Sequence, residues 1–224
     1  MLVFTAEQLR AVGRRIFVAA GAPEDVAAQV ADSLVENNLA GHDSHGIIRI
    51  PAYVQAIQRG GIVPGARPTV VRETPTAALI EGNLAFGQVS ATFATELAIA
   101  RAMEAHLAAV GIVRCNHIGR LGEYAERGAR AGLISMVVVG GFGGAGAAPF
   151  GGAARALGTN PFSFGVPTAP GFDEVLIPGE PEQRSRAKRL AQGIPVAEES
   201  WRRLVAAAGG DGRRAWSGAP GVAR

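Results

Sequence analysis

The sequence is short of cysteine and of aromatic side chains. Among its 224 residues there is one cysteine, Cys115, with two tryptophans and two tyrosines. A single cysteine excludes an internal disulfide and favours a reducing compartment. The first residues lack a basic segment followed by an apolar run, so we expect no signal peptide and a cytoplasmic protein.

Long apolar helices are also missing. Residues 133–154 carry no charge and are long enough to cross a bilayer, but this stretch is rich in glycine and contains Pro149. Glycine costs about 1 kcal/mol and proline about 3 kcal/mol in a helix interior. We therefore predict no membrane helix here, but a buried strand over 133–139 followed by a glycine loop.

The net charge of +3 is unevenly distributed, because basic residues concentrate in 182–224. A basic tail can bind nucleic acid, but this one has no series of interleaved aromatic residues to stack on bases. We expect a solvated helix face and a disordered end from residue 209, and no nucleic-acid partner.

Residue patterns predict an alternation of helices and strands. Thr5-Ala6-Glu7-Gln8 is typical of a capping box that starts a helix ending at Gly21. Further helices are predicted from Pro23, at 88–109 with Val89, Phe93, Met103 and Leu107 facing inward, and at 122–131, 181–191 and 198–208. Strands are predicted at 69–73, 77–81, 112–115, 133–139, 162–166 and 174–177. This rhythm indicates an α/β fold with helical N-terminal and C-terminal segments packed around a mixed sheet.

The segment from Gly41 to Tyr53 gathers polar chemistry that is scarce elsewhere. If it is one helix, capped by Asp43 or Ser44, then His45, Arg49 and Tyr53 fall on one face. Pro51 should kink this helix or split it in two. An imidazole, a guanidinium and a phenol together could bind and deprotonate a small acid. A solvated polar helix face is the alternative, and spacing alone favours that alternative.

A glycine motif follows the strand predicted at 133–139. Gly141, Gly143 and Gly146 satisfy G-x-G-x-x-G, which is typical of Rossmann dinucleotide sites. Such a site also needs a helix at the third glycine and an acid about twenty residues later. Pro149 prevents that helix and no acid appears before Asp173, so we reject the Rossmann interpretation.

Four motifs together resemble those of the type II malate/L-lactate dehydrogenase family, across nearly all of residues 1–208. They are Asp43-Ser44-His45-Gly46 with Arg49, Pro51 and Tyr53; Asn116-His117 with Gly119; Ala148-Pro149 with Gly151-Gly152; and Leu157-Gly158-Thr159-Asn160-Pro161. The resemblance implies a non-Rossmann NAD(P)-binding fold, a homodimer, and hydride transfer between NAD or NADP and a small 2-hydroxy or 2-oxo acid.

The resemblance also implies roles for single residues. His45 and His117 match acid/base positions, and the resemblance does not decide between them; we expect His45 to act as the acid/base with His117 close by. Arg49 and Tyr53 are the expected substrate-binding residues, and Arg49 can grip a carboxylate with two hydrogen bonds. Gly158, Thr159 and Asn160 are the expected cofactor-binding residues, although by itself their motif is ordinary turn chemistry. No metal site is predicted.

The sequence departs from the family pattern in its middle. After Thr168 it passes within a few residues to a segment that resembles the family's C-terminal signature, so a large central block is missing. A catalytically impaired or inactive truncated member is therefore the alternative function. The gap should also expose strand edges and apolar faces, which predicts a partly molten chain.

We expect four parts. They are an N-terminal helical part carrying His45 and Arg49 (1–66), a truncated α/β cofactor part (67–172), C-terminal helices returning to the N-terminal part (173–208) and a disordered tail (209–224).

Overall fold

The computed structural model describes residues 2–140, 148, 150–154, 158, 160–167 and 180–208. Its helices are α1 (Ala6–Ala19), α2 (Glu24–Leu39), α3 (Ile50–Gln58), α4 (Gly87–Ala105), α5 (Leu121–Arg130), α6 (Glu180–Gln192) and α7 (Glu198–Ala207). Its strands are β1 (Leu2–Phe4), β2 (Thr69–Glu73), β3 (Ala77–Glu81), β4 (Ala109–Val113), β5 (Ser135–Val138), β6 (Phe162–Gly165) and β7 (Ile194–Val196). The predicted α/β class is confirmed. The predicted strand at 174–177 and the tail from 209 lie outside the described residues.

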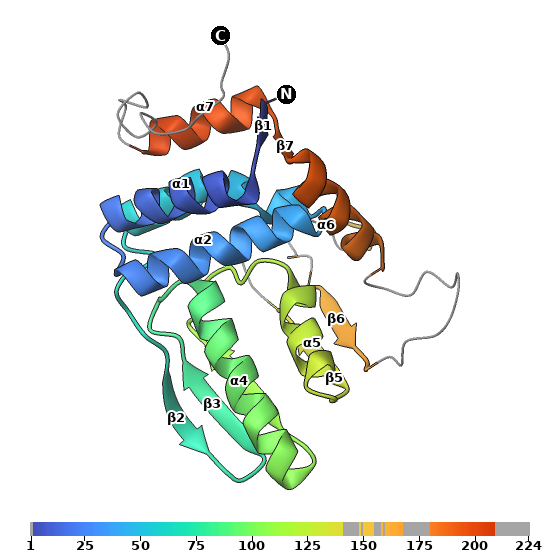
Figure 1. The fold of residues 1–224 in the computed structure, drawn as a ribbon. Helices are drawn as coiled ribbons and strands as arrows, with labels where there is room; N and C mark the ends of the chain where they lie inside the picture. Colours follow the sequence, from blue (N-terminus) through green and yellow to red (C-terminus); the bar gives the residue numbers. More distant parts are fainter. Residues whose placement is uncertain are drawn as a thin grey trace.

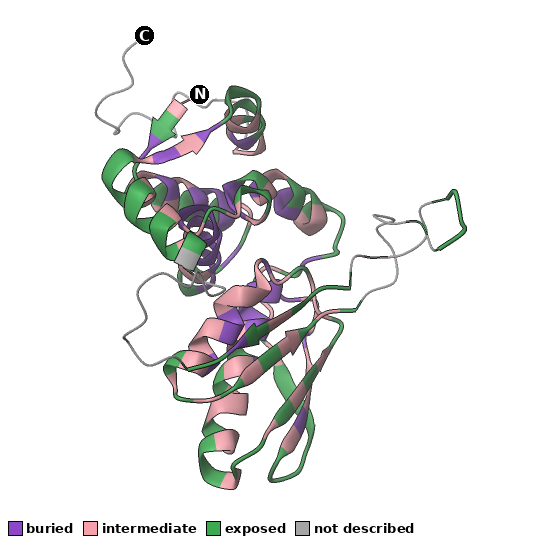
Figure 2. Ribbon diagram, turned by 90° about the vertical axis from the view of Figure 1, so that its right-hand side faces the viewer, coloured by how far each residue is buried: buried purple, intermediate pink, exposed green. Residues whose placement is uncertain are grey.

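The N-terminal helices enclose the main core. Thr5 accepts a hydrogen bond from the Gln8 backbone while the Gln8 side chain accepts one from the Thr5 backbone, so the predicted capping box is confirmed. Helices α1 and α2 pack against each other, and the buried side chains gather there (Figure 2). Helix α3 adds Ile50 and Val54 to this core.

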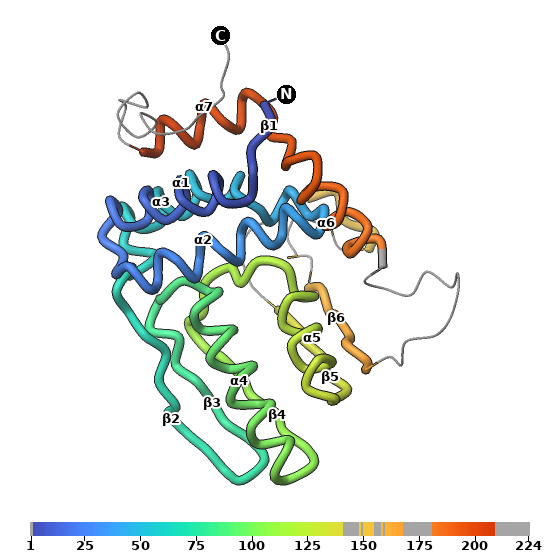
Figure 3. Tube along the Cα trace, in the orientation of Figure 1, coloured from blue at the N-terminus to red at the C-terminus, as the bar shows by residue number. Residues whose placement is uncertain are grey.

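The two ends of the described chain meet in a small sheet that the sequence patterns did not predict. Strand β1 pairs antiparallel with β7, with Leu2 opposite Val196 and Phe4 opposite Ile194. Figures 1 and 3 show these strands side by side above α1. Phe4 stacks on Trp201 of α7, with ring centroids 4.3 Å apart. The C-terminal helices are thereby attached to the N-terminal ones.

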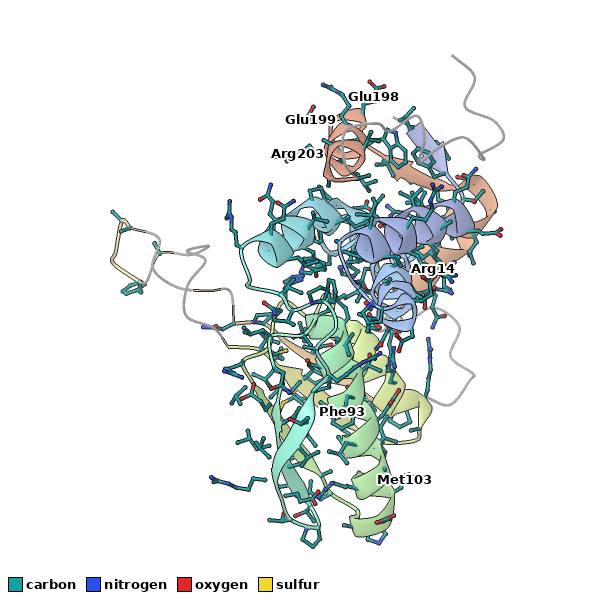
Figure 4. The ribbon with its side chains drawn as sticks, turned by 90° about the vertical axis from the view of Figure 1, so that its left-hand side faces the viewer. Arg14, Phe93, Met103, Glu198, Glu199 and Arg203 are labelled. Atoms are coloured by element: carbon teal, nitrogen blue, oxygen red, sulfur yellow. The ribbon has the colours of Figure 1, made fainter. Side chains whose placement is uncertain are left out.

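The mixed sheet is small. Strands β2 and β3 are antiparallel, and β3 and β4 are parallel with Ile80 opposite Ile112. The two strands β2 and β3 have the predicted bounds. Helix α4 packs on β4, but the outer part of the helix is exposed, including Phe93 and Met103 (Figure 4). The prediction that Phe93, Met103 and Leu107 face a core was wrong: Phe93 and Met103 are exposed on α4, and Leu107 is exposed beyond the end of the helix at Ala105.

The prediction that the strand at 133–139 is buried was also wrong. Strand β5 pairs only with β6 among the described strands, and α5 covers one face of the pair. The other face leaves four large apolar side chains 59–66% exposed, namely Met136, Val138, Phe162 and Phe164. Alternate residues of the two strands therefore face solvent. Within the described ranges, no helix has the length and apolarity to cross a membrane.

Candidate functional site

The segment from Asp43 to Arg49 is not the single helix that spacing predicted. It forms two 3-10 turns, Asp43–His45 and Ile47–Arg49, and α3 begins only at Ile50. Gly46 separates the turns with extended backbone, and Pro51 occupies the first turn of α3. The predicted split is confirmed. The predicted cap by Asp43 or Ser44 was wrong, because none of these turns has a side-chain cap.

Two buried asparagines at the end of α2 hold the turns in place. Asn37 Nδ2 donates to the His45 carbonyl at 3.1 Å. Asn38 Oδ1 accepts from the Ile47 backbone at 2.9 Å, and its Nδ2 donates to Asp43 at 2.6 Å. A Cβ on Gly46 would lie 2.2 Å from Asn38 Oδ1, so only glycine fits there. The position of His45 is thus set by side chains of another helix.

Helix α6 fastens the same turns from outside. Arg189 donates to both carboxylate oxygens of Asp43, at 2.6 and 2.9 Å, and also donates to the Asn38 carbonyl. The Arg189 side chain is 17% exposed and the Asp43 side chain is 49% exposed, so the guanidinium is largely covered while the carboxylate remains in contact with water. His42 contacts Glu182 of the same helix at 3.2 Å. A distant part of the chain therefore supports the His45 segment.

His117 reaches the site on the loop after β4. Asn116 Nδ2 lies 2.9–3.1 Å from the carbonyls of Gly61, Leu84 and Ala85, which anchors this loop. Gly87 allows the loop to pass the start of α4, because a Cβ there would lie 2.3 Å from the carbonyl oxygens of both Asn116 and His117. The strand before this loop ends at Val113, whereas the sequence predicted a strand at 112–115.

The fold brings the predicted residues together. The rings of His45 and His117 are stacked, with centroids 5.4 Å apart and planes 21° apart. Tyr53 Oη lies 2.7 Å from His117 Nδ1, and Gln88 Nε2 donates to the same Tyr53 oxygen at 2.8 Å. The cluster therefore draws on the 3-10 turns, α3, α4 and the loop after β4.

Burial and one cation shape the protonation states of the cluster. Burial lowers the pKa of His117 to about 4, and the positive charges of Arg49 and His45 act in the same direction. Burial followed by the charges of Arg49 and His42 also lowers the pKa of His45. Burial raises the pKa of Tyr53 to about 12, against hydrogen bonding by Gln88 and the charge of Arg49. At neutral pH both imidazoles are uncharged and the phenol keeps its proton.

Arg49 borders a groove between α3 and α7. The groove has a volume of about 750 Å³, and its lining contains Arg49 and Arg203 but no acidic residue. Figure 4 shows Arg203 on α7. Arg49 Nε is buried and has no hydrogen-bond partner within the described part of the chain. Two cations, an unpaired buried donor and the absence of acids in this lining suit an anionic ligand.

The expected cofactor residues are described only in part. Gly158 is half-buried, and Asn160 is exposed with left-handed backbone at φ 44°. Thr159 lies outside the described residues, as do the glycines 141, 143 and 146. In the ranges that the structure covers, no group of three or more His, Cys, Asp or Glu side chains could hold a metal ion.

Gln88 and the asparagine pair Asn37-Asn38 belong to this site but were not singled out from sequence. All three are buried, with 0–3% exposure. One available signal was an adjacent pair of amides near the end of an otherwise apolar helix. No pattern marked Gln88, because a glutamine in a helix's first turn is normally solvated.

Comparisons with known proteins show which proteins this chain resembles. The family model described as malate/L-lactate dehydrogenase matches residues 4–171. Hydroxycarboxylate dehydrogenase B from Escherichia coli K12 is 39% identical over 195 residues, which is 86% of this chain and 54% of that protein. Ureidoglycolate dehydrogenase (NAD(+)) from E. coli O157:H7 is 35% identical over 165 residues, covering 70% of this chain and 44% of that protein.

A solved structure has a similar fold over most of this chain. Malate dehydrogenase from Pyrococcus horikoshii is 36% identical and superposes with a TM-score of 0.68, covering 75% of this chain and 47% of that one. The chain thus spans about half the length of the curated relatives it matches.

Proposed function

Because the chain belongs to the malate/L-lactate dehydrogenase family, we propose that it serves hydride transfer between a nicotinamide cofactor and a small 2-hydroxy or 2-oxo acid. The observation that carries this proposal is the cluster of His45, His117, Tyr53 and Arg49, since these side chains come from separate elements and converge. A solvated polar helix face would not have Tyr53 buried at 4% exposure and bonded to a histidine.

Arg49 is proposed to bind the substrate carboxylate. A guanidinium can donate two parallel hydrogen bonds to a carboxylate, whereas an ammonium group cannot reproduce that fork. Its unpaired buried Nε and the acid-free groove beside it support this role. Tyr53 does not line this groove, but it lies close enough to Arg49 to be influenced by its charge, and it is proposed to position the substrate together with Arg49.

The two histidines are proposed to handle the substrate hydroxyl. Oxidation of a 2-hydroxy acid requires a base for the hydroxyl proton, and a neutral imidazole can act as that base. Both rings are uncharged at neutral pH, because burial and Arg49 lower their pKa values. Such a group contributes about 10²–10⁴-fold to the rate.

NAD or NADP is proposed to bind with the turn at Gly158, Thr159 and Asn160. The two described members fit such a role, since Gly158 has no side chain to block approach and Asn160 presents an exposed amide. When bound, the nicotinamide would supply or accept the hydride. One relative is a ureidoglycolate dehydrogenase (NAD(+)), and its name supports NAD as the cofactor.

We extend the proposal to the organisation of the protein. We propose, as the sequence predicts, that the protein is a cytoplasmic homodimer. We also keep the division into four parts, at 1–66, 67–172, 173–208 and 209–224. No membrane or nucleic-acid partner is proposed. A catalytically impaired truncated member is the second candidate, and two observations favour it: the chain spans about half of its relatives, and the β5–β6 face is uncovered.

Cofactor titration separates the two candidates. NADH and NADPH are added to the purified protein and quenching of cofactor fluorescence is followed, with circular dichroism confirming the fold. Saturable quenching followed by turnover of oxaloacetate or pyruvate supports the oxidoreductase. A folded protein that shows no quenching at millimolar cofactor excludes it and leaves the inactive candidate.

Variants then assign the roles. Arg49→Lys should raise KM for the 2-oxo acid about 10-fold or more, because charged hydrogen bonds contribute roughly 1.5–3 kcal/mol. Arg72→Lys on exposed strand β2 is the matched control and should leave KM unchanged. Equal effects of the two substitutions would contradict a carboxylate clamp at Arg49.

A further inference from the structure

A chain of three side chains runs from the buried start of α4 to the site. Gln88 is 1% exposed and Tyr53 is 4% exposed. Gln88 Nε2 lies 2.8 Å from Tyr53 Oη, which in turn lies 2.7 Å from His117 Nδ1. Phe17 and Phe86 pack around the Tyr53 ring, so the phenol has little freedom to move away from His117.

The direction of these hydrogen bonds follows from which groups can donate. The Gln88 amide nitrogen has only protons to offer, so the Tyr53 oxygen accepts from it. Arg49 lies close to the same phenol, and its guanidinium has only donors, so it cannot accept the phenol proton. The single Tyr53 hydroxyl proton is therefore directed to His117 Nδ1. A neutral imidazole that accepts at Nδ1 carries its proton on Nε2.

We propose that Gln88 is a positioning residue that acts through Tyr53 to hold neutral His117 as its Nε2–H tautomer. In this form His117 donates a hydrogen bond to the substrate oxygen, and His45 takes the hydroxyl proton. The inference rests on the proposed function, and it decides the role that spacing and resemblance leave open between the two histidines.

The electrostatics support a donor at His117. Its pKa of about 4 keeps the ring neutral under working conditions, so it cannot act as a proton-donating imidazolium at neutral pH. A neutral imidazole can still polarise a carbonyl through its N–H. His45 Nδ1 lies 2.9 Å from Ser44 Oγ, and in the tautomer where Nδ1–H donates to that hydroxyl oxygen, His45 Nε2 is unprotonated and can accept the substrate proton.

The proton balance is then complete. During oxidation the hydroxyl proton would pass to His45, the carbinol hydrogen would be transferred with both electrons of the C–H bond as a hydride to the oxidised nicotinamide of the proposed function, and the C–O bond would become a carbonyl. His117 keeps its Nε2 proton throughout and stabilises the oxygen as its charge changes. The reduction runs the same steps backwards, with His45 returning the proton.

Nuclear magnetic resonance of the imidazole nitrogens tests the tautomer directly. The protein contains four histidines, so ¹⁵N-histidine labelling gives few signals, and loss of one set in His117→Gln assigns it. The expected pattern near neutral pH is a protonated Nε2 and an unprotonated Nδ1. In the reverse orientation of the Gln88 amide, its oxygen would accept from Tyr53 and His117 would carry Nδ1–H, so that pattern overturns the proposal.

Two substitutions test the positioning role. Tyr53→Phe removes the hydroxyl proton and Gln88→Met removes the amide donor that directs it, and either should convert the single tautomer into a mixture. Thr95→Val on the same helix is the control, because Thr95 Oγ1 bonds only to the Ala91 carbonyl among the described contacts, and it should keep the tautomer. If both Gln88→Met and Tyr53→Phe fold and His117 remains entirely in the Nε2–H tautomer, the proposal that Gln88 acts through Tyr53 on His117 is overturned.

These measurements need neither substrate nor cofactor, so they can fail independently of the proposed function. If turnover is found, Gln88→Met should lower kcat about 10-fold with KM unchanged, since only the transition state needs the oriented donor. A rise in KM alone would indicate a binding role for Gln88 and would contradict the proposal.

Discussion

At the scale of single residues, the site combines imidazoles of depressed pKa with a phenol of raised pKa. The same burial acts on all three groups, and its sign differs because protonation charges an imidazole but neutralises a phenolate. Arg49 then opposes protonation of both histidines. A pocket that keeps imidazoles neutral beside a cation suits a negatively charged substrate.

The lowered histidine pKa values predict how stability depends on pH. Between pH 6.5 and about 4 the unfolded chain binds protons at His45 and His117, while the folded chain keeps His117 neutral. The free energy of unfolding should therefore fall as pH drops through this window and recover above it. Urea denaturation across this pH range measures the effect. His117→Gln should flatten the slope, and an unchanged slope would contradict the depressed pKa.

Gly87 is a second residue with a testable consequence. Gly87→Ala would place a Cβ 2.3 Å from two carbonyl oxygens of the His117 loop, which we expect to cost about 1–3 kcal/mol and to displace His117. Gly111→Ala in β4 is the matched control, because its Cβ would meet Leu79 at an ordinary 3.5 Å. Chemical denaturation should give a lower free energy of unfolding for Gly87→Ala than for Gly111→Ala. Equal values would show that the His117 loop moves to accommodate the added methyl group.

At the scale of elements, α6 supports the site from the far end of the chain. The helix contacts α2 and places Arg189 on Asp43, which lies in the same 3-10 turn as His45. Because Asp43 is also bonded to Asn38, the carboxylate joins α2, the 3-10 turn and α6. The C-terminal helix is therefore part of what orders His45.

Removal of the Arg189 side chain tests this support. Arg189→Met should lower the free energy of unfolding by about 1–3 kcal/mol, because two charged hydrogen bonds are lost and Asp43 keeps only Asn38. Arg184→Met, at an exposed position of the same helix, should stay within about 0.5 kcal/mol. Faster amide exchange at residues 43–46 in Arg189→Met, and not in Arg184→Met, would localise the effect to the His45 segment. Faster exchange throughout the protein would contradict a local role of Arg189 in holding Asp43.

At the scale of the whole molecule, the helical core is well buried and the β5–β6 pair is poorly buried. The helical layers hold most of the buried side chains, while the outer face of β5–β6 is apolar and uncovered (Figure 2). Uncovered apolar surface lowers solubility and cooperativity. This distribution agrees with a chain that spans about half of its relatives.

We therefore expect a gradual thermal transition and binding of an apolar dye such as ANS. The double variant Phe162→Thr, Phe164→Thr should bind less dye and aggregate less, because both side chains are about 60% exposed and threonine is favourable in strands. A sharp cooperative transition of the monomer without dye binding would refute this expectation.

Local sequence was sufficient for much of the secondary structure. The capping box at Thr5, the strands at 69–73 and 77–81, and the start of α3 beside Pro51 all follow from interactions within a few residues. The candidate residues His45, Arg49, Tyr53 and His117 were also visible, chiefly because their motifs resemble a known family. These features depend on residue type and spacing, which the chain carries without reference to its fold.

Tertiary structure decided what those residues contact. Periodicity placed His45, Arg49 and Tyr53 on one helix, but Gly46 breaks that helix, and Asn37, Asn38 and Arg189 from other elements reassemble the site. The pairing of β1 with β7, the exposure of β5 and the hydrogen bond from Gln88 to Tyr53 likewise join residues far apart in sequence. Such contacts depend on which surfaces meet when the chain closes, and local patterns carry no information about that choice.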